Sequence, residues 1–366
     1  MRNSAPPPRA APSIIPIDTR WPDAVNTEPW QHGADLDYML ELVDYWLTTF
    51  DWRRHEDMLN DVLPSETVTV AGLDVHYARL RGRAPSPFPL LLLHGWPGSY
   101  FEMYKLAPLL ADQFDVIVPS LPGHGFSGIP PTTGFGADEC ADVMHALMTE
   151  VLGYSRYGAQ GGDRGAFVST GLADRHPDAV AAIHLNLAGG IPGTGDELTE
   201  AEQQWLRDQQ GWLAQEGGYI AIQGTRPQTL AYGLHDSPVG MLAWIVEKWR
   251  AWSDCGGDIE SCFTKDELLT NAMLYWVTGT MRSSMHYYWE HRANPPAAVR
   301  PVRIDVPTAI AMFPKEVMRV PRSAAERKYN LQRWTEFPRG GHFAAMEQPE
   351  ALAADIKAFF LGLQTP

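Results

Sequence analysis

The sequence predicts an α/β protein whose mostly parallel, doubly wound sheet is split by a helical insertion. Short apolar runs, typical of buried parallel strands, alternate with helix-like segments in the first half of the chain. Near residue 191 the pattern changes to Trp-rich helical stretches, and no strand-like run interrupts them before residue 301. A buried strand then returns at residues 306–314, and an amphipathic helix at residues 348–361 closes the pattern.

The chain before the sheet divides into a tail and an extension. Residues 1–13 are rich in Pro and Ala, which predicts a disordered tail. Residues 14–85 form the expected N-terminal region. Within it, apolar side chains recur at helical spacing over residues 35–49, and residues 66–80 alternate like a β-hairpin. We therefore expect a helix-plus-hairpin extension.

The core is expected in two parts, residues 86–190 and residues 302–366. In the first part, Ser99 and Glu102 have the spacing of a capping box that opens a helix after the first strand. Strands are expected in this part at residues 90–95, 114–120, 156–160 and 179–187. A helix is expected at residues 137–153.

The insertion between the two core parts is residues 191–301, and an insertion of this kind usually acts as a lid. Helices are expected in it at residues 199–215, 239–252 and 265–290.

Composition and charge limit the classes of partner. The chain has 29 Lys and Arg against 44 Asp and Glu, a net charge of −15, and no basic run, which argues against nucleic acid and anionic membranes. Its 3 cysteines form no CxxC pair, which favours a reducing compartment. No signal-peptide stretch and no run of 18 apolar residues occurs. We expect a soluble, cytoplasmic protein without a membrane anchor.

The segment YGAQGGDRGAF, residues 157–167, has the spacing of a nucleophile elbow, G-x-Nu-x-G, between a strand and a helix. The nucleophile position is Asp163, and no G-x-S-x-G occurs in the chain. A carboxylate at this position suits attack on an sp³ carbon, which forms an alkyl-enzyme ester that water then splits. The alternative is that Asp163 merely caps the following helix.

The segment LHGWPG, residues 93–98, ends the first strong strand, where the α/β-hydrolase fold places an oxyanion-hole amide. The backbone N–H of Trp96 would supply this donor, and the N–H of Arg164 would supply the second. The alternative is an ordinary strand-to-helix turn.

A base and its partner are expected near the C-terminus. His342 lies in a glycine-rich loop after the strand-like residues 331–337, where the histidine of the order nucleophile, acid, histidine belongs. Glu316 follows the strand at residues 306–312 and would orient His342 and stabilise its charge. Each residue taken alone also fits a purely structural role.

The segment GHGFSG, residues 123–128, matches G-x-G-x-x-G literally. It opens a Pro-Pro loop instead of a helix, so we do not assign dinucleotide binding to it. No HExxH motif, Walker loop or cluster of metal ligands occurs in the sequence. We therefore expect no cofactor and no metal.

Taken together, these motifs resemble the microsomal-type epoxide hydrolases of the α/β-hydrolase superfamily over about residues 19–362. The segments that carry the resemblance are TRWPD (19–23), YWLTTFDWR (45–53), HGWPGS (94–99), QGGDRG (160–165), GGYIAIQGTRPQTLAYGLHDSPVG (217–240), YWVTGTMRSSMHYYWE (275–290) and GGHFAAMEQP (340–349).

The resemblance implies an epoxide hydrolase that opens an oxirane to a vicinal diol. It also implies two lid tyrosines that donate hydrogen bonds to the epoxide oxygen, which by motif are Tyr219 and Tyr288. The family commonly has Trp after the elbow Asp, whereas this chain has Arg164. A cation there would lower the pKa of Asp163 or meet a polar substrate.

Two other functions remain open on the sequence alone. The first is a haloalkane dehalogenase-like hydrolase, which also uses an elbow Asp. The second is a catalytically silent relative that binds a small molecule. The expected partner is a small-molecule epoxide, bulky or aromatic if the Trp-rich lid lines the pocket, and a homodimer is left open.

Overall fold

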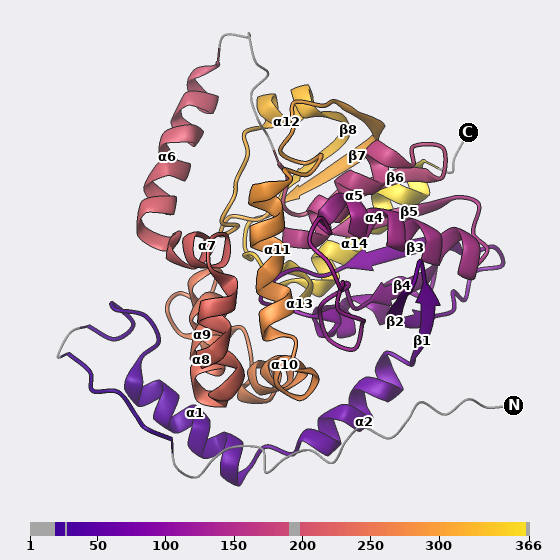
Figure 1. The fold of residues 1–366 in the computed structure, drawn as a ribbon. Coiled ribbons are helices and arrows are strands. Elements are labelled where there is room, and N and C mark those ends of the chain that lie inside the picture. Colours follow the sequence, from indigo (N-terminus) through magenta and orange to yellow (C-terminus); the bar gives the residue numbers. More distant parts are fainter. Residues whose placement is uncertain (1–18, 26–27, 190–197, 364–366) are drawn as a thin grey trace, which may run out of the picture.

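The protein is described here by a computed structural model that covers residues 19–25, 28–189 and 198–363. The predicted tail at residues 1–13 lies outside the described residues. In Figure 1 the helices of the insertion, coloured red to orange, lie on one side of the sheet. The first N-terminal helix lies beside the insertion, and the second runs from there toward the edge of the sheet.

Eight strands form one mixed sheet in the order β1-β2-β4-β3-β5-β6-β7-β8. Neighbouring strands are parallel from β4 to β8, and β2 is antiparallel to both β1 and β4. This sheet confirms the predicted mostly parallel α/β core. The strands are β1 (Ser65–Val70), β2 (Leu73–Leu80), β3 (Phe88–Leu93), β4 (Phe114–Pro119), β5 (Tyr157–Gly161), β6 (Val180–Leu185), β7 (Ile304–Met312) and β8 (Tyr329–Glu336).

Helices cover both faces of the sheet. Leu92 of β3 belongs to an apolar cluster that includes Ile356 of α14, whereas its neighbour Leu91 belongs to a second cluster with Leu172 of α5. Since both faces are buried, β3 is a continuous apolar run without alternating polar residues. The helices on the two faces include α3 (Leu106–Leu110), α4 (Ala137–Ala146), α5 (Asp163–Arg175), α12 (Arg322–Lys328) and α14 (Pro349–Gly362).

Within its described residues, the insertion between β6 and β7 contains helices joined by loops, and no strand. Its helices are α6 (Glu200–Glu216), α7 (Gly218–Gln223), α8 (Pro227–Asp236), α9 (Pro238–Ala251), α10 (Lys265–Thr278) and α11 (Met281–Ala293). The sequence predicted one helix at residues 265–290, and this was wrong. Gly279 adopts φ 65° and ends α10, so the chain restarts as α11 in a new direction.

The N-terminal extension joins the sheet. The predicted hairpin is formed by β1 and β2, and β2 also pairs with β4, which places both strands at the edge of the main sheet. Ahead of it lie α1 (Leu36–Thr48) and α2 (Trp52–Val62). The Tyr45 hydroxyl of α1 donates to Asp266 of α10 at 2.9 Å, which ties the extension to the insertion.

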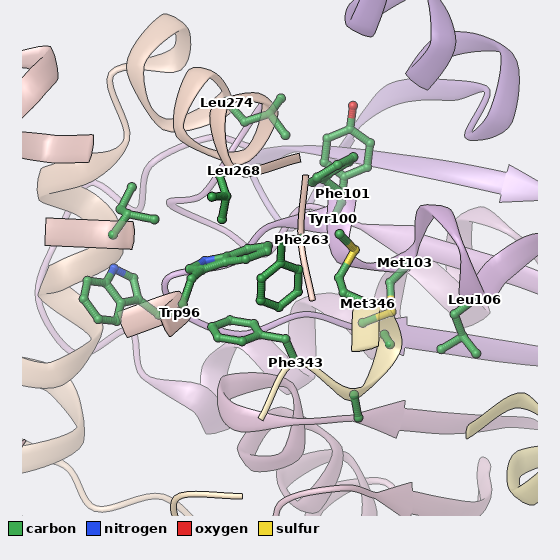
Figure 2. Close-up of a cluster of buried hydrophobic side chains, with 14 of the residues drawn as sticks. Trp96, Tyr100, Phe101, Met103, Leu106, Phe263, Leu268, Leu274, Phe343 and Met346 are labelled. Atoms are coloured by element: carbon green, nitrogen blue, oxygen red, sulfur yellow. The ribbon is translucent and has the colours of Figure 1, made fainter. Parts of the chain in front are cut away.

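The insertion packs on the core through aromatic rings. Trp249 of α9 stacks on Phe343 with ring centroids 4.5 Å apart, and Phe263 meets the same Trp249 edge-on at 4.8 Å. Figure 2 shows Phe263 and Phe343 within this cluster, together with Trp96. Because Phe343 directly follows His342 in the chain, this aromatic cluster joins the insertion to the loop that carries His342.

The segment after β3 departs from the expected capping box. A 3₁₀ helix, Tyr100–Tyr104, follows Ser99, and the Ser99 hydroxyl accepts from Phe101 N at 3.4 Å instead of from Glu102 N. The Glu102 carboxylate accepts from the Ser99 amide, as a capping box requires, and also from Gly95 N at 3.5 Å. This second contact draws the Glu102 side chain into the interior, so only half of the box forms.

Within the described ranges, no helix is both long and apolar enough to cross a membrane.

Shortening a buried side chain of the central strand β3 should destabilise the fold. Leu92→Ala removes a fully buried side chain and should reduce the free energy of unfolding by about 2–5 kcal/mol. Leu213→Ala on α6 is the matched control, because Leu213 is 49% exposed, and it should change that energy by less than about 0.5 kcal/mol. Urea unfolding followed by circular dichroism measures both. Equal losses would contradict the packing described for β3.

Candidate active site

The turn between β5 and α5 places Asp163 in a strained backbone conformation. Its φ of 45° lies in the left-handed region, which a non-glycine residue rarely adopts. The flanking glycines make this turn feasible. A Cβ on Gly161 would lie 2.3 Å from the Gly165 carbonyl, and a Cβ on Gly165 would lie 2.0 Å from Leu93 O. The turn has the geometry predicted for a nucleophile elbow.

The Asp163 carboxylate is directed at the end of β3. Its Oδ1 accepts a hydrogen bond from Trp96 N at 2.8 Å. Gly162 occupies the N-cap position of α5, and no side chain caps that helix. The capping alternative for Asp163 therefore has no support in the structure. Among the described residues, the Trp96 amide reaches this carboxylate, whereas the Arg164 amide does not.

His342 and Glu316 come from two other loops at the same edge of the sheet. The His342 Nδ1 atom lies 2.7 Å from Glu316 Oε1, and its Nε2 lies 3.6 Å from Asp163 Oδ2. The loop is held in place by His342 N, which donates to Trp252 O at 2.9 Å. The structure thus brings together the three residues that the sequence singled out as nucleophile, acid and histidine.

Burial and neighbouring charges act on His342 in opposite directions. Burial alone would lower its pKa because it disfavours the imidazolium. The negative charge of Glu316 and its hydrogen bond outweigh this, with smaller contributions from Asp163 and Glu102, and raise the pKa of His342 to about 9. A pKa above 7 favours the protonated imidazole of His342 at neutral pH in this structure.

Tyr219 of α7 and Tyr288 of α11 lie together above Trp96. The Tyr219 ring is parallel to the Trp96 ring with centroids 5.5 Å apart, and Tyr288 meets Trp96 edge-on at 5.5 Å. The two tyrosine rings are 5.6 Å apart. Burial, the largest cause, raises the pKa of both phenols above the ordinary value, so both remain protonated at neutral pH.

Tyr287, next to Tyr288 in the chain, points elsewhere. It packs edge-on against His124 at 5.7 Å and is buried. Consecutive helical residues point about 100° apart, which separates the two tyrosines. Only Tyr288 joins the cluster with Trp96 and Tyr219.

The Arg164 side chain lies against these tyrosines. Its guanidinium is 3.9 Å from the Tyr288 ring centroid and 5.1 Å from that of Tyr287, and the residue is only 3% exposed. Its charge partly offsets the effect of burial on the Tyr288 pKa. Arg164, which stands where the family resemblance leads one to expect Trp, therefore acts on Tyr288.

Three further polar residues lie near Asp163 that the sequence did not assign to the site. They are Glu102, Gln160 and Asn186, all buried. Burial raises the pKa of Glu102 to about 7. Gln160 lies in the segment of the nucleophile elbow, so its place in the sequence could have indicated that it lies near Asp163. Nothing in the chain around Asn186 indicated a role, because β6 brings it there from a distant segment.

No group of three or more His, Cys, Asp or Glu side chains in the described part of the chain could hold a metal ion.

Two family models match the chain. "Epoxide hydrolase N terminus" matches residues 16–103, and "alpha/beta hydrolase fold" matches residues 89–216. Epoxide hydrolase 1 of Oryctolagus cuniculus is 37% identical over 372 residues, which cover 90% of this chain and 81% of that protein.

Two solved structures extend the likeness to the fold. The Aspergillus niger epoxide hydrolase has a TM-score of 0.83 at 32% identity, covering 94% of this chain and 91% of that one. The juvenile hormone epoxide hydrolase of Bombyx mori has a TM-score of 0.85 at 30% identity, covering 94% and 89%. With the sequence motifs and the fold described above, these matches show that the chain belongs to the epoxide hydrolase family of the α/β-hydrolase superfamily.

Proposed function

We propose that this epoxide hydrolase works through an ester on Asp163. The observation that carries the proposal is the place of the Asp163 carboxylate, whose Oδ1 lies 2.8 Å from Trp96 N and whose Oδ2 lies 3.6 Å from His342 Nε2. One oxygen is thus held by a backbone donor, and the other faces the base. This arrangement suits a nucleophile that is later regenerated by water.

In the first step, Asp163 attacks one carbon of the oxirane. A C–O bond to the carboxylate forms as the ring C–O bond breaks, and the ring oxygen gains negative charge. Tyr219 and Tyr288 donate hydrogen bonds to that oxygen and supply its proton. Their closeness, with ring centroids 5.6 Å apart, supports a shared role at one oxygen.

In the second step, His342 activates water against the Asp163 ester. Free His342 has a pKa of about 9, raised in part by the Asp163 charge, and a protonated imidazole cannot accept a proton. Ester formation neutralises Asp163 and removes that contribution, so the pKa of His342 falls when a base is needed. Glu316 stabilises the imidazolium that forms.

The backbone amide of Trp96 would stabilise the oxyanion during ester hydrolysis, since it already contacts Asp163 Oδ1. The amide of Arg164 is the second donor that we propose. Catalytic hydrogen bonds often tighten only in the transition state, so its lack of a contact in the free enzyme is compatible with this role.

The other two functions fit the site less well. A haloalkane dehalogenase needs N–H donors for a halide ion, whereas Tyr219 and Tyr288 offer hydroxyls. A catalytically silent relative would lack a member of the set Asp163, Glu316 and His342, yet all three lie within contact distance of a neighbour in the set. We propose bulky or aromatic epoxides as substrates, because aromatic rings surround the two tyrosines.

Single-turnover hydrolysis of styrene oxide in ¹⁸O water tests the ester. We expect heavy oxygen in the Asp163 carboxylate, because water attacks the ester carbonyl and leaves its oxygen on the enzyme. Mass spectrometry of the peptide that contains Asp163 measures it, with Asp163→Asn as the control that forms no ester. Turnover that labels only the diol would mean direct attack of water on the epoxide.

Neutralising Asp163 should lower the pKa of His342. Asp163→Asn carries no charge, like the ester, and so removes one cause of the value of about 9. NMR titration of the imidazole should show that His342 loses its proton at lower pH in this variant. Asp112→Asn, at the Lys357 ion pair, is the control for losing a carboxylate elsewhere. An unchanged His342 titration would refute the charge coupling.

Removing either lid hydroxyl should slow ring opening. Tyr219→Phe and Tyr288→Phe should each reduce the single-turnover alkylation rate by about 10²-fold, since each removes one donor to the developing oxyanion. Tyr287→Phe is the matched control on the same helix and should keep the native rate. Stopped-flow tryptophan fluorescence measures the rate. Equal effects of the substitutions at Tyr287 and Tyr288 would contradict the assignment of Tyr288 as a hydrogen-bond donor to the epoxide oxygen.

A further inference from the structure

A small cavity lies behind the Asp163 carboxylate. Its volume is about 10 Å³, close to what a single water molecule requires. Asp163 and His342 line it together with Glu102, Gln160 and Asn186. Tyr219 and Tyr288 are not among its lining residues.

The Gln160 amide is an incompletely satisfied polar group at this cavity. Gln160 is 1% exposed, and its Nε2 donates to Asn186 Oδ1 at 2.8 Å. Its Oε1 is buried and has no hydrogen-bond partner in the described structure. If the amide were rotated, the nitrogen would be the atom without a partner, so one polar atom needs a ligand in either orientation. A water molecule in the cavity would meet that need.

The Glu102 carboxyl is the second polar group of the cavity. It is 8% exposed, and Gly98 makes room for it, because a Cβ there would lie 1.5 Å from Glu102 Oε1. No Lys or Arg pairs with it among the ion pairs of the described residues. Burial raises its pKa to about 7, so it can both accept and donate hydrogen bonds near neutral pH.

The distance between the side chains of His342 and Asp163 is consistent with a water molecule in this cavity. Their nearest side-chain atoms, Nε2 and Oδ2, are 3.6 Å apart, longer than a good hydrogen bond. A water molecule in the adjoining cavity would be next to both the base and the carboxyl carbon that it must attack.

We infer that this cavity holds the hydrolytic water, with Gln160 and Glu102 as the residues that position it. The inference rests on the proposed ester mechanism. The water oxygen bonds to Cγ of Asp163 while one water proton passes to His342 Nε2. The tetrahedral intermediate then collapses, the ester C–O bond to the substrate breaks, and His342 returns its proton to the leaving alkoxide. Collapse leaves Asp163 as a carboxylic acid that carries the second water proton. This proton passes to the phenolate of the tyrosine that protonated the ring oxygen, so Asp163 regains its carboxylate, the tyrosine regains its hydroxyl and the diol is released.

The two half-reactions, alkylation of Asp163 and hydrolysis of the ester, distinguish a residue that positions the water from one with a purely structural role. Gln160→Met preserves side-chain length and removes the amide. We expect the alkylation rate to stay within about twofold of native, and ester hydrolysis to slow by about tenfold or more, as for the loss of one hydrogen bond to the water. The ester on Asp163 should then accumulate and be visible by mass spectrometry of the intact protein.

A second pair of variants tests the same site independently of Gln160. Glu102→Gln keeps the shape and hydrogen bonding of the carboxyl and should keep hydrolysis within a few-fold of native, whereas Glu102→Met should slow it by about tenfold. Met103→Leu is the control, since Met103 also lines the cavity but offers no polar hydrogen-bonding group to hold water. It should change neither half-reaction.

The outcomes separate this inference from the mechanism on which it rests. If native enzyme forms no Asp163 ester, the proposed mechanism itself fails. If the native ester forms but Gln160→Met and Glu102→Met hydrolyse it at the native rate, only the water site is wrong. Equal slowing of both half-reactions in these variants, or slowing in Met103→Leu, would mean a general packing defect and would also overturn the inference.

Discussion

The left-handed backbone at Asp163 is the constraint on which the site depends. A non-glycine residue in that conformation costs on the order of 1–3 kcal/mol, and it persists only where its surroundings enforce it. Here the enforcement is close packing, because Gly161 and Gly165 let α5 press directly on β5 and on the Leu93 carbonyl. The same packing projects the carboxylate toward the Trp96 amide. A larger residue at either glycine would move α5 and Asp163 with it.

Burial then makes the charges of the site depend on one another. His342 lies among three carboxyl groups, those of Glu316, Asp163 and Glu102, and each raises its pKa. In a low-dielectric interior, a change in one charge alters the proton affinity of the others. Formation and hydrolysis of an ester on Asp163 would alternately remove and restore one of these charges. The basicity of His342 would thereby follow the reaction without any movement of the chain.

Two residues, Trp96 and Arg164, connect Asp163 to the insertion, because the backbone and the side chain of each make different contacts. Trp96 offers its amide to Asp163 and its ring to both Tyr219 and Tyr288. Arg164 follows Asp163 in the chain and places its guanidinium on the Tyr288 ring. The position of the tyrosines relative to the carboxylate is thus set by aromatic and cation–π packing. This packing holds the two tyrosine rings of the insertion against Trp96, next to Asp163.

The sequence by itself determined the features that are local or periodic. These include the parallel strands, the helical insertion and the elbow around Asp163, since each depends on neighbouring residues. Motif resemblance added Tyr219 and Tyr288. Only the tertiary structure decided that the N-terminal hairpin extends the main sheet, that Glu102 turns into the interior so that only half of its capping box forms, and that Gln160 meets Asn186. These outcomes depend on contacts between segments far apart in the chain, and local pattern carries no information about such contacts.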